Sequence, residues 1–159
     1  MTTPAANKLP HLRWNSLEES ARAYFSATPL QRIYIIRMGV PAKFVAIIAQ
    51  RMRIPRDTLY SSLNLARATI DRKVQNEQLL NQDESERVLA IAKLIGQADT
   101  IVRESGVTEG FNPSQWVAAW LQRAHPAING KPPAELMDTG DGRELVTDLL
   151  AKQQSSAYT

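Results

Sequence analysis

The 159-residue chain is 43% hydrophobic, contains no cysteine and has a net charge of +3, which excludes a disordered polypeptide, disulfide bonds, thiolate metal sites and cysteine nucleophiles. The sequence has neither a signal-peptide pattern nor an apolar run of about 20 residues, so we expect a cytoplasmic protein with one large domain or two small ones. The charge is uneven: residues 1–75 hold twelve lysines and arginines against four acids (+8), and residues 76–159 hold seven against twelve (−5), which favours two surfaces with different partners over two ordinary solvated faces.

Residues 16–52 predict three helices. A capping box places Ser16 at the start of the first, with a glutamate three residues further on. Thr28 and Pro29 open the second helix, and Gly39 ends it. In the third, apolar side chains recur at the helical spacing of three and four residues. Because no stretch alternates β-branched and polar residues as a strand would, we expect an all-α protein.

The next two short helices, in residues 56–74, have a helix-turn-helix pattern. A tight break is expected at Asn64, because asparagine tolerates the left-handed backbone that such a break often needs. Ile70 of the second helix would face inward, and the second helix would be the recognition helix. The other residues expected to be buried around the break are Leu59, Leu63 and Leu65.

The polar side chains of this unit have the chemistry of DNA recognition. Arginine reads guanine edges with a fork of donors, threonine contacts phosphate or a thymine methyl, and lysine neutralises phosphate. Arginines just upstream would reach the flanking backbone. An ordinary basic helical hairpin is the alternative. The predicted DNA-binding residues are Arg67, Thr69, Arg72 and Lys73 on the second helix, with Arg56 and Arg53 upstream.

The acidic half begins with a long helix that Gly106 ends and whose first turn is rich in acids, which the helix dipole favours. Gly96 weakens the middle of this helix and therefore indicates close packing against a neighbour. A further helix, capped by Asn112, places Trp116 and Trp120 four residues apart on one face. We expect at least one of these tryptophans in the core.

Prolines and glycines are dense between Pro126 and Gly142, in the stretch PAINGKPPAELMDTGDG. Asn129-Gly130 is a strong turn pair. The two prolines that follow pre-set the first turn of a short helix. We therefore expect residues 120–142 to form a rigid clasp of helices and turns, followed by a last helix. The predicted apolar face of that helix is Leu145, Val146, Leu149 and Leu150.

The C-terminal part of the chain resembles the toxin-binding domain of the Xre/MbcA/ParS antitoxins. In WLQRAHPAINGKPPAELMDTGDGRELVTDLLAK, the Trp-Leu pair, the Pro-Ala-Ile turn, Asn-Gly-Lys, Pro-Pro, Asp-Thr and the final Leu-Leu pair follow one another in the family's order. Upstream, DESERVLAIAKLIGQAD is similar to the family's Ser-Asp-Arg-led helix, and ARATIDRK is similar to its recognition segment. Together these pieces extend from about residue 40 to residue 152.

The resemblance implies an all-α fold in which an N-terminal, Xre-like helix-turn-helix bundle is followed by a helical toxin-binding domain. We divide the chain into an N-terminal helical arm at residues 1–40, a helix-turn-helix DNA-binding region at 41–80 and a toxin-binding domain at 81–159. The boundary between the last two lies near residues 76–82, where only one residue is charged.

The resemblance also implies a function. Antitoxins of this kind neutralise a RES-domain toxin, a NAD-consuming enzyme with a fold like the ADP-ribosyltransferases, by covering its active-site cleft. They dimerise within a larger toxin–antitoxin complex, which binds operator DNA and represses its own operon. The expected partners are thus the cognate RES-domain toxin, operator DNA and a second copy of the chain. The chain itself would need no cofactor and no catalytic residue.

Acids near the C-terminus are the candidate contacts with the toxin. A cleft that binds an anionic dinucleotide tends to be basic, so an acidic surface would complement it, and proline-fixed turns lower the cost of ordering on binding. A solvated helix face is the alternative. The candidate toxin-binding residues are Asp138, Asp141, Glu144 and Asp148, the turn residues Asn129, Gly130, Lys131 and Thr139, and Tyr158 from the tail as an insertion into the cleft.

Two other functions are open from the sequence. A stand-alone helix-turn-helix transcriptional regulator would use its C-terminal domain only to dimerise or to sense a ligand. An enzyme has little support, because His11 and His125 are the only histidines and neither a phosphate-binding glycine loop nor a metal-ligand spacing is present. We therefore expect neither a catalytic site nor a metal site.

Overall fold

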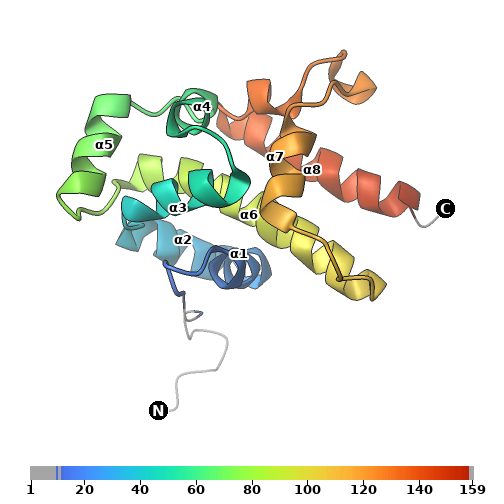
Figure 1. Cartoon of the computed structure of the whole chain (residues 1–159), viewed down its shortest axis with the longest axis horizontal. Helices are drawn as coiled ribbons and strands as arrows, with labels where there is room; N and C mark the ends of the chain where they lie inside the picture. The colour runs from blue at the N-terminus through green and yellow to red at the C-terminus, as the bar shows by residue number, and fades with distance from the viewer. Residues whose placement is uncertain (1–9, 11, 158–159) are drawn as a thin grey trace, which may run out of the picture.

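The computed structural model describes residue 10 and residues 12–157, and this part of the chain is helical without a strand, as predicted. Figure 1 shows α6 running through the middle of the molecule, with the other helices around it. None of the described helices is both long and apolar enough to cross a membrane. The elements are α1 (Leu17–Ser26), α2 (Pro29–Met38), α3 (Lys43–Met52), α4 (Arg56–Ser62), α5 (Arg67–Gln75), α6 (Gln82–Ser105), α7 (Pro113–Leu121), the 3-10 helices η2 (Pro126–Ile128) and η3 (Pro133–Leu136), and α8 (Gly140–Ala157).

Side-chain caps begin α2, α6 and α7, whereas α3, α4 and α5 have none. At α2, Thr28 accepts a hydrogen bond from the backbone N–H of Gln31, whose side chain accepts from the backbone N–H of Thr28. Ser16 begins α1 at the predicted place but makes no side-chain capping bond, so the predicted capping box is absent. The glutamate at its third position, Glu19, instead lies 3.9 Å from the guanidinium of Arg13.

Gly96 allows a close contact between α6 and α1. A Cβ atom at this position would lie 2.1 Å from the carbonyl oxygen of Ala21 in α1 and 2.9 Å from the Cβ of Phe25. Only a residue without a side chain lets the two backbones approach so closely. The expectation of close packing at Gly96 is therefore confirmed, and its partner is α1.

One continuous hydrophobic core joins the basic and acidic halves of the chain. Phe44 of α3, Ile95 of α6 and Trp120 of α7 are fully buried members of the same cluster, which continues to Leu150 of α8. Trp116 is partly buried and stacks on Trp120 with ring centroids 6.1 Å apart. Helix α3 packs against α7, and α4 packs against η3, so these contacts fix the position of the helix-turn-helix region relative to the clasp.

Candidate functional site

The α4–α5 unit buries its apolar side chains as the sequence predicts. Leu59, Leu63 and Ile70 are at most 1% exposed, and the link between the helices is the four-residue stretch 63–66. Asn64 in this link has φ of +53°. The expected left-handed break at Asn64 is therefore present.

Three polar contacts hold this unit in place. The Tyr60 hydroxyl donates to Asp71 Oδ1 at 2.8 Å and ties α4 to α5. Lys73 Nζ pairs with Glu84 in the first turn of α6, and Arg87 donates from Nη1 to the carbonyl oxygens of residues 63 and 64. The first two contacts join residues eleven positions apart, so they depend on the fold rather than on local sequence. Together they make α4 and α5 a rigid extension of α6.

The outer face of α5 is less basic than its sequence indicates. Lys73 is mostly enclosed by its pair with Glu84, which removes it from the outward surface on which we expected it. Arg67 is exposed but lies 3.2 Å from Asp57 and 3.7 Å from Asp71. Such exposed pairs are weak, since water and salt screen them, so phosphate could compete for the guanidinium. Of the remaining predicted DNA-binding residues, Arg53, Arg56 and Arg72 are exposed and Thr69 is half-buried.

A second helix-turn-helix geometry, which the sequence pattern did not predict, joins α3 to α4. The link has only three residues, 53–55, and Arg53 in it has φ of +56°. Glycine is the usual residue at such a position, so an arginine there gives no sign of the turn in the sequence. By this geometry α4, rather than α5, would be the second helix of the motif.

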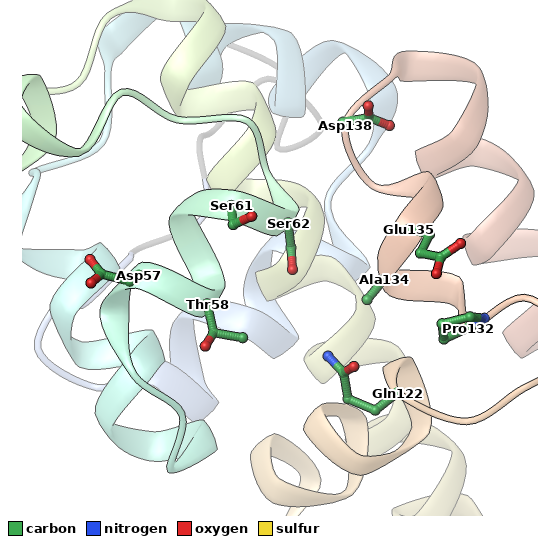
Figure 2. A pocket seen from close by; sticks show the side chains of 9 residues that line it. All are labelled: Asp57, Thr58, Ser61, Ser62, Gln122, Pro132, Ala134, Glu135 and Asp138. Carbon is green, nitrogen blue, oxygen red and sulfur yellow. The ribbon is translucent and has the colours of Figure 1, made fainter.

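The exposed side of α4 faces the clasp across a cleft of about 540 Å³. Figure 2 shows the two walls: Thr58 and Ser62 of α4 on one side, and Gln122, Pro132 and Ala134 on the other. Three carboxylates also line the cleft: Asp57 from α4, Glu135 from η3 and Asp138 from the segment after η3. A DNA phosphate approaching this side of α4 would meet those carboxylates, whereas α5 projects freely at the opposite end from the C-terminus (Figure 1).

The clasp is a tight hairpin followed by a 3-10 turn. His125 and Lys131 form an antiparallel bridge in which the His125 N–H donates to the Lys131 carbonyl at 3.1 Å. Asn129 and Gly130 reverse the chain with φ of +61° and +76°, which confirms the predicted turn. Ile128 is the buried residue of the hairpin loop, and the His125 ring lies 5.2 Å from that of Trp120. The hairpin is thus anchored to the core while its tip is exposed.

The junction of the clasp with α8 depends on a close backbone contact. Thr139 caps the helix by accepting from the Gly142 N–H at 2.9 Å, and Arg143 Nη1 donates to the Met137 carbonyl at 3.1 Å. A Cβ at Gly142 would lie 1.8 Å from the carbonyl oxygen of Leu136. A side chain at position 142 would therefore force η3 and α8 apart.

Every candidate toxin-binding residue in the described part of the chain is exposed. On α8, Asp141, Glu144 and Asp148 follow one another at spacings of three and four, so they share a face. Leu145 lies with these acids and is 48% exposed, so its expected place on the buried face of the helix is wrong. The inward positions are Val146 and Leu150, which are buried. Tyr158 and His11 lie outside the described residues.

A polar cleft of about 380 Å³ lies beside this acidic face, between α8, α6 and the N-terminal helices. Glu144 and Asp148 line it together with Lys93 of α6. Burial lowers the pKa of Lys93, with a further lowering from Arg32, while the two α8 carboxylates oppose the shift. Within the described residues, no group of three or more His, Asp or Glu side chains is arranged to hold a metal ion.

Comparison with known families assigns both halves of the chain. The family described as the antitoxin Xre-like helix-turn-helix domain matches residues 31–93, from α2 into α6. The family described as the antitoxin Xre/MbcA/ParS C-terminal toxin-binding domain matches residues 107–155, which include the clasp and most of α8. The curated Prs ADP-ribosylating antitoxin of Sphingobium sp. (strain YBL2) is 38% identical to this chain over 137 residues, which cover 86% of each protein.

Proposed function

The chain belongs to the Xre/MbcA/ParS antitoxin family, and we propose that it neutralises a RES-domain toxin that consumes NAD, by covering the active-site cleft of that toxin. The family matches establish an antitoxin with a helix-turn-helix domain and a toxin-binding domain. The name of the Sphingobium relative couples an antitoxin to ADP-ribosylation of Prs, and the chemistry that we propose for the toxin is of the same kind.

The observation that carries this proposal is the exposed acidic face of α8 beside the anchored clasp. Asp141, Glu144 and Asp148 lie on one exposed face, and Asp138 stands where η3 leads into α8. A toxin cleft built for an anionic dinucleotide is expected to carry positive charge, which this face complements. The hairpin and the close contact at Gly142 hold this surface in one conformation before binding, so little conformational entropy is lost when the complex forms.

The toxin-binding surface that we propose comprises this acidic face and the tip of the hairpin. Asn129, Gly130 and Lys131 form the tip, and Thr139 lies next to Asp138. Tyr158 remains a proposed contact beyond the described residues. Leu145 joins this set because it is exposed amid the acids of α8, where an apolar side chain is suited to the dry centre of an interface.

For DNA, we propose that α5 contacts the operator and that the complex represses its own operon. Arg67 and Arg72 are exposed on α5, and Arg53 and Arg56 lie exposed upstream. Thr69 is half-buried and would contact the DNA at close range. Lys73 is paired with Glu84, so it would hold α5 in position rather than contact a phosphate. The acidic lining of the cleft at α4 favours α5 over α4 as the helix that meets DNA.

We further propose that two copies of the chain act together in the cytoplasm, and that the chain works by binding rather than catalysis. Operators read by helix-turn-helix proteins commonly have two half-sites, which a dimer matches. Covering the toxin's cleft and contacting DNA both require a complementary binding surface rather than a reactive side chain.

Co-purification tests the toxin partnership. The tagged chain is co-expressed with the product of the gene beside its own, and the complex is isolated at moderate salt. We expect a stable complex that excludes NAD from the toxin. A chain that is folded and binds its upstream DNA but captures no neighbouring product would instead be a stand-alone transcriptional regulator.

A further inference from the structure

Helix α2 carries an apolar stripe on its solvent side. Leu30, Ile33, Tyr34 and Met38 are 53%, 41%, 48% and 65% exposed. Their spacing of three, one and four residues places them on one face of the helix. On the opposite side Ile35 is buried in the core. A helix that is apolar on its outer as well as its inner face indicates a contact beyond the chain itself.

The stripe continues beyond the end of α2. Leu79 is 54% exposed, and its Cβ lies 3.5 Å from the Cβ position of a side chain built at Gly39. The backbone there is fixed by the Leu80 N–H, which donates to the Val40 carbonyl at 2.7 Å. At the same end, a hollow of about 180 Å³ is lined by Trp14, Ile35 and Met38, among other residues. The stripe therefore has a projecting leucine, Leu30, at one end and an apolar hollow at the other.

We propose that this stripe, Leu30, Ile33, Tyr34, Met38 and Leu79, is a self-association surface on which α2 of a second copy packs antiparallel. A two-fold axis near Tyr34 places Leu30 of each chain opposite Met38 of the other, where it fills the hollow. Both halves of such an isologous contact use the same residues, so one surface suffices.

The exposed area is sufficient for a weak dimer. About half of the surface of five large side chains is available, which is on the order of 500 Å² per chain and about 1,000 Å² for two, the lower limit for a specific interface. Arg37 is the charged residue on this face. In the antiparallel arrangement its two copies lie about 9 Å apart along the helices, six residues at about 1.5 Å each, whereas a parallel arrangement would bring them together.

Pairing through α2 also suits the helix-turn-helix region. The segment after α5 is hydrogen-bonded to the segment after α2, since the Ala42 N–H donates to the Gln78 carbonyl at 2.9 Å. A two-fold axis at α2 therefore holds two α5 helices in a fixed relation, as two half-sites require. The pairing names a surface for the two copies in the proposed function and so rests on it, but it is measured on the chain alone, separately from toxin capture.

The absence of cysteine from the sequence permits a direct test on the full-length chain. Tyr34→Cys places one thiol per chain near the two-fold axis, and Val107→Cys, at an apolar position that is 72% exposed and outside the stripe, is the matched control. Under mild oxidation at low protein concentration, we expect the Tyr34→Cys chain to form a disulfide-linked dimer and the Val107→Cys chain to remain uncrosslinked.

Sedimentation of cysteine-free variants gives the second readout. Ile33→Glu should raise the dissociation constant of the dimer roughly 100-fold or more, because two copies of the buried charge enter one apolar contact, while Val107→Glu should leave it unchanged. A chain that is monomeric at all concentrations, or a dimer that survives Ile33→Glu, would overturn the proposal. If the monomeric chain still captured toxin and Ile33→Glu abolished that capture, the stripe would be a toxin contact and the proposed function would stand without this surface.

Discussion

At Gly142 a single missing side chain determines whether the clasp can meet α8. The Cβ of an alanine would lie 1.8 Å from the Leu136 carbonyl oxygen, whereas at Gly140, two residues earlier in the same helix, the nearest atom is 3.9 Å away. We expect Gly142→Ala to destabilise the chain by about 1–3 kcal/mol, as overpacking does, and to displace η3. Gly140→Ala should be neutral or stabilising, because alanine is the better helix former. Thermal unfolding of the two variants measures the difference, and equal stabilities would contradict the contact.

Because of Tyr60, we expect the folded chain to lose stability at alkaline pH. Burial, and next its hydrogen bond to Asp71, raise the pKa of the hydroxyl from 10.0 to about 12. The pKa of Tyr60 is higher in the folded chain than in the unfolded chain. Its contribution to the free energy of unfolding is therefore complete below about pH 10 and is lost as the pH rises to about 12. Tyr24 has a similarly raised pKa of about 12, mainly through burial, so part of the loss persists in Tyr60→Phe. Denaturant unfolding between pH 9 and 12 should show a shallower decline for Tyr60→Phe than for wild type, and identical slopes would remove Tyr60 from the explanation.

At the scale of elements, α5 and α4 compete for the role of DNA-contacting helix. Arg72→Ala on α5 should weaken operator binding by about 1–3 kcal/mol if the arginine reads a base, and Arg67→Ala should act in the same direction. Ser61→Ala, on the exposed side of α4 that lines the acidic cleft, should leave binding unchanged. Titration of labelled operator DNA at fixed salt separates the two helices. If Ser61→Ala weakened binding and both arginine variants did not, the motif would be α3–α4, with its turn at Arg53.

Helix α8 predicts an electrostatic contribution to toxin capture. Glu144→Gln with Asp148→Asn removes two charges from the acidic face without reversing them beside Lys93, and should slow association about tenfold at low salt, with a smaller effect as salt rises. Glu104→Gln with Glu109→Asn removes the same charge from exposed positions outside the clasp and α8. Surface-binding kinetics should distinguish the two pairs, and an equal slowing in both would indicate a nonspecific charge effect.

The elements were predictable where local chemistry defines them. The turns at Asn64 and Asn129, the cap at Thr28 and the close contact at Gly96 all follow from single residues whose backbone or side-chain properties limit the alternatives. The pairs Tyr60–Asp71 and Lys73–Glu84 were not predictable, because each joins different helices whose relative position the sequence pattern does not define. The same reason explains Leu145: its hydrophobicity suggested the buried face, but its angular position on α8 places it outward.

In the whole molecule, the basic and acidic halves of the chain share one hydrophobic core. The core continues from α1 to α8, and α6 belongs to both parts, since the helix-turn-helix match ends at residue 93 within it. We therefore propose that the division near residues 76–82 separates two binding surfaces rather than two independently folded domains. The cleft between α4 and the clasp lies where those surfaces meet, and it could not be predicted, since it depends on how distant segments pack.

We propose that the clasp and α8 inhibit a NAD-consuming toxin, and a direct test is whether the chain stops the loss of NAD. The toxin encoded beside this chain is incubated with NAD, and the folded chain is added in increasing amounts. We expect NAD consumption to fall to zero at a fixed ratio of the two proteins, and we expect Gly142→Ala, checked for folding, to need a higher ratio than Gly140→Ala. Undiminished NAD consumption in the presence of excess folded chain would contradict this proposal.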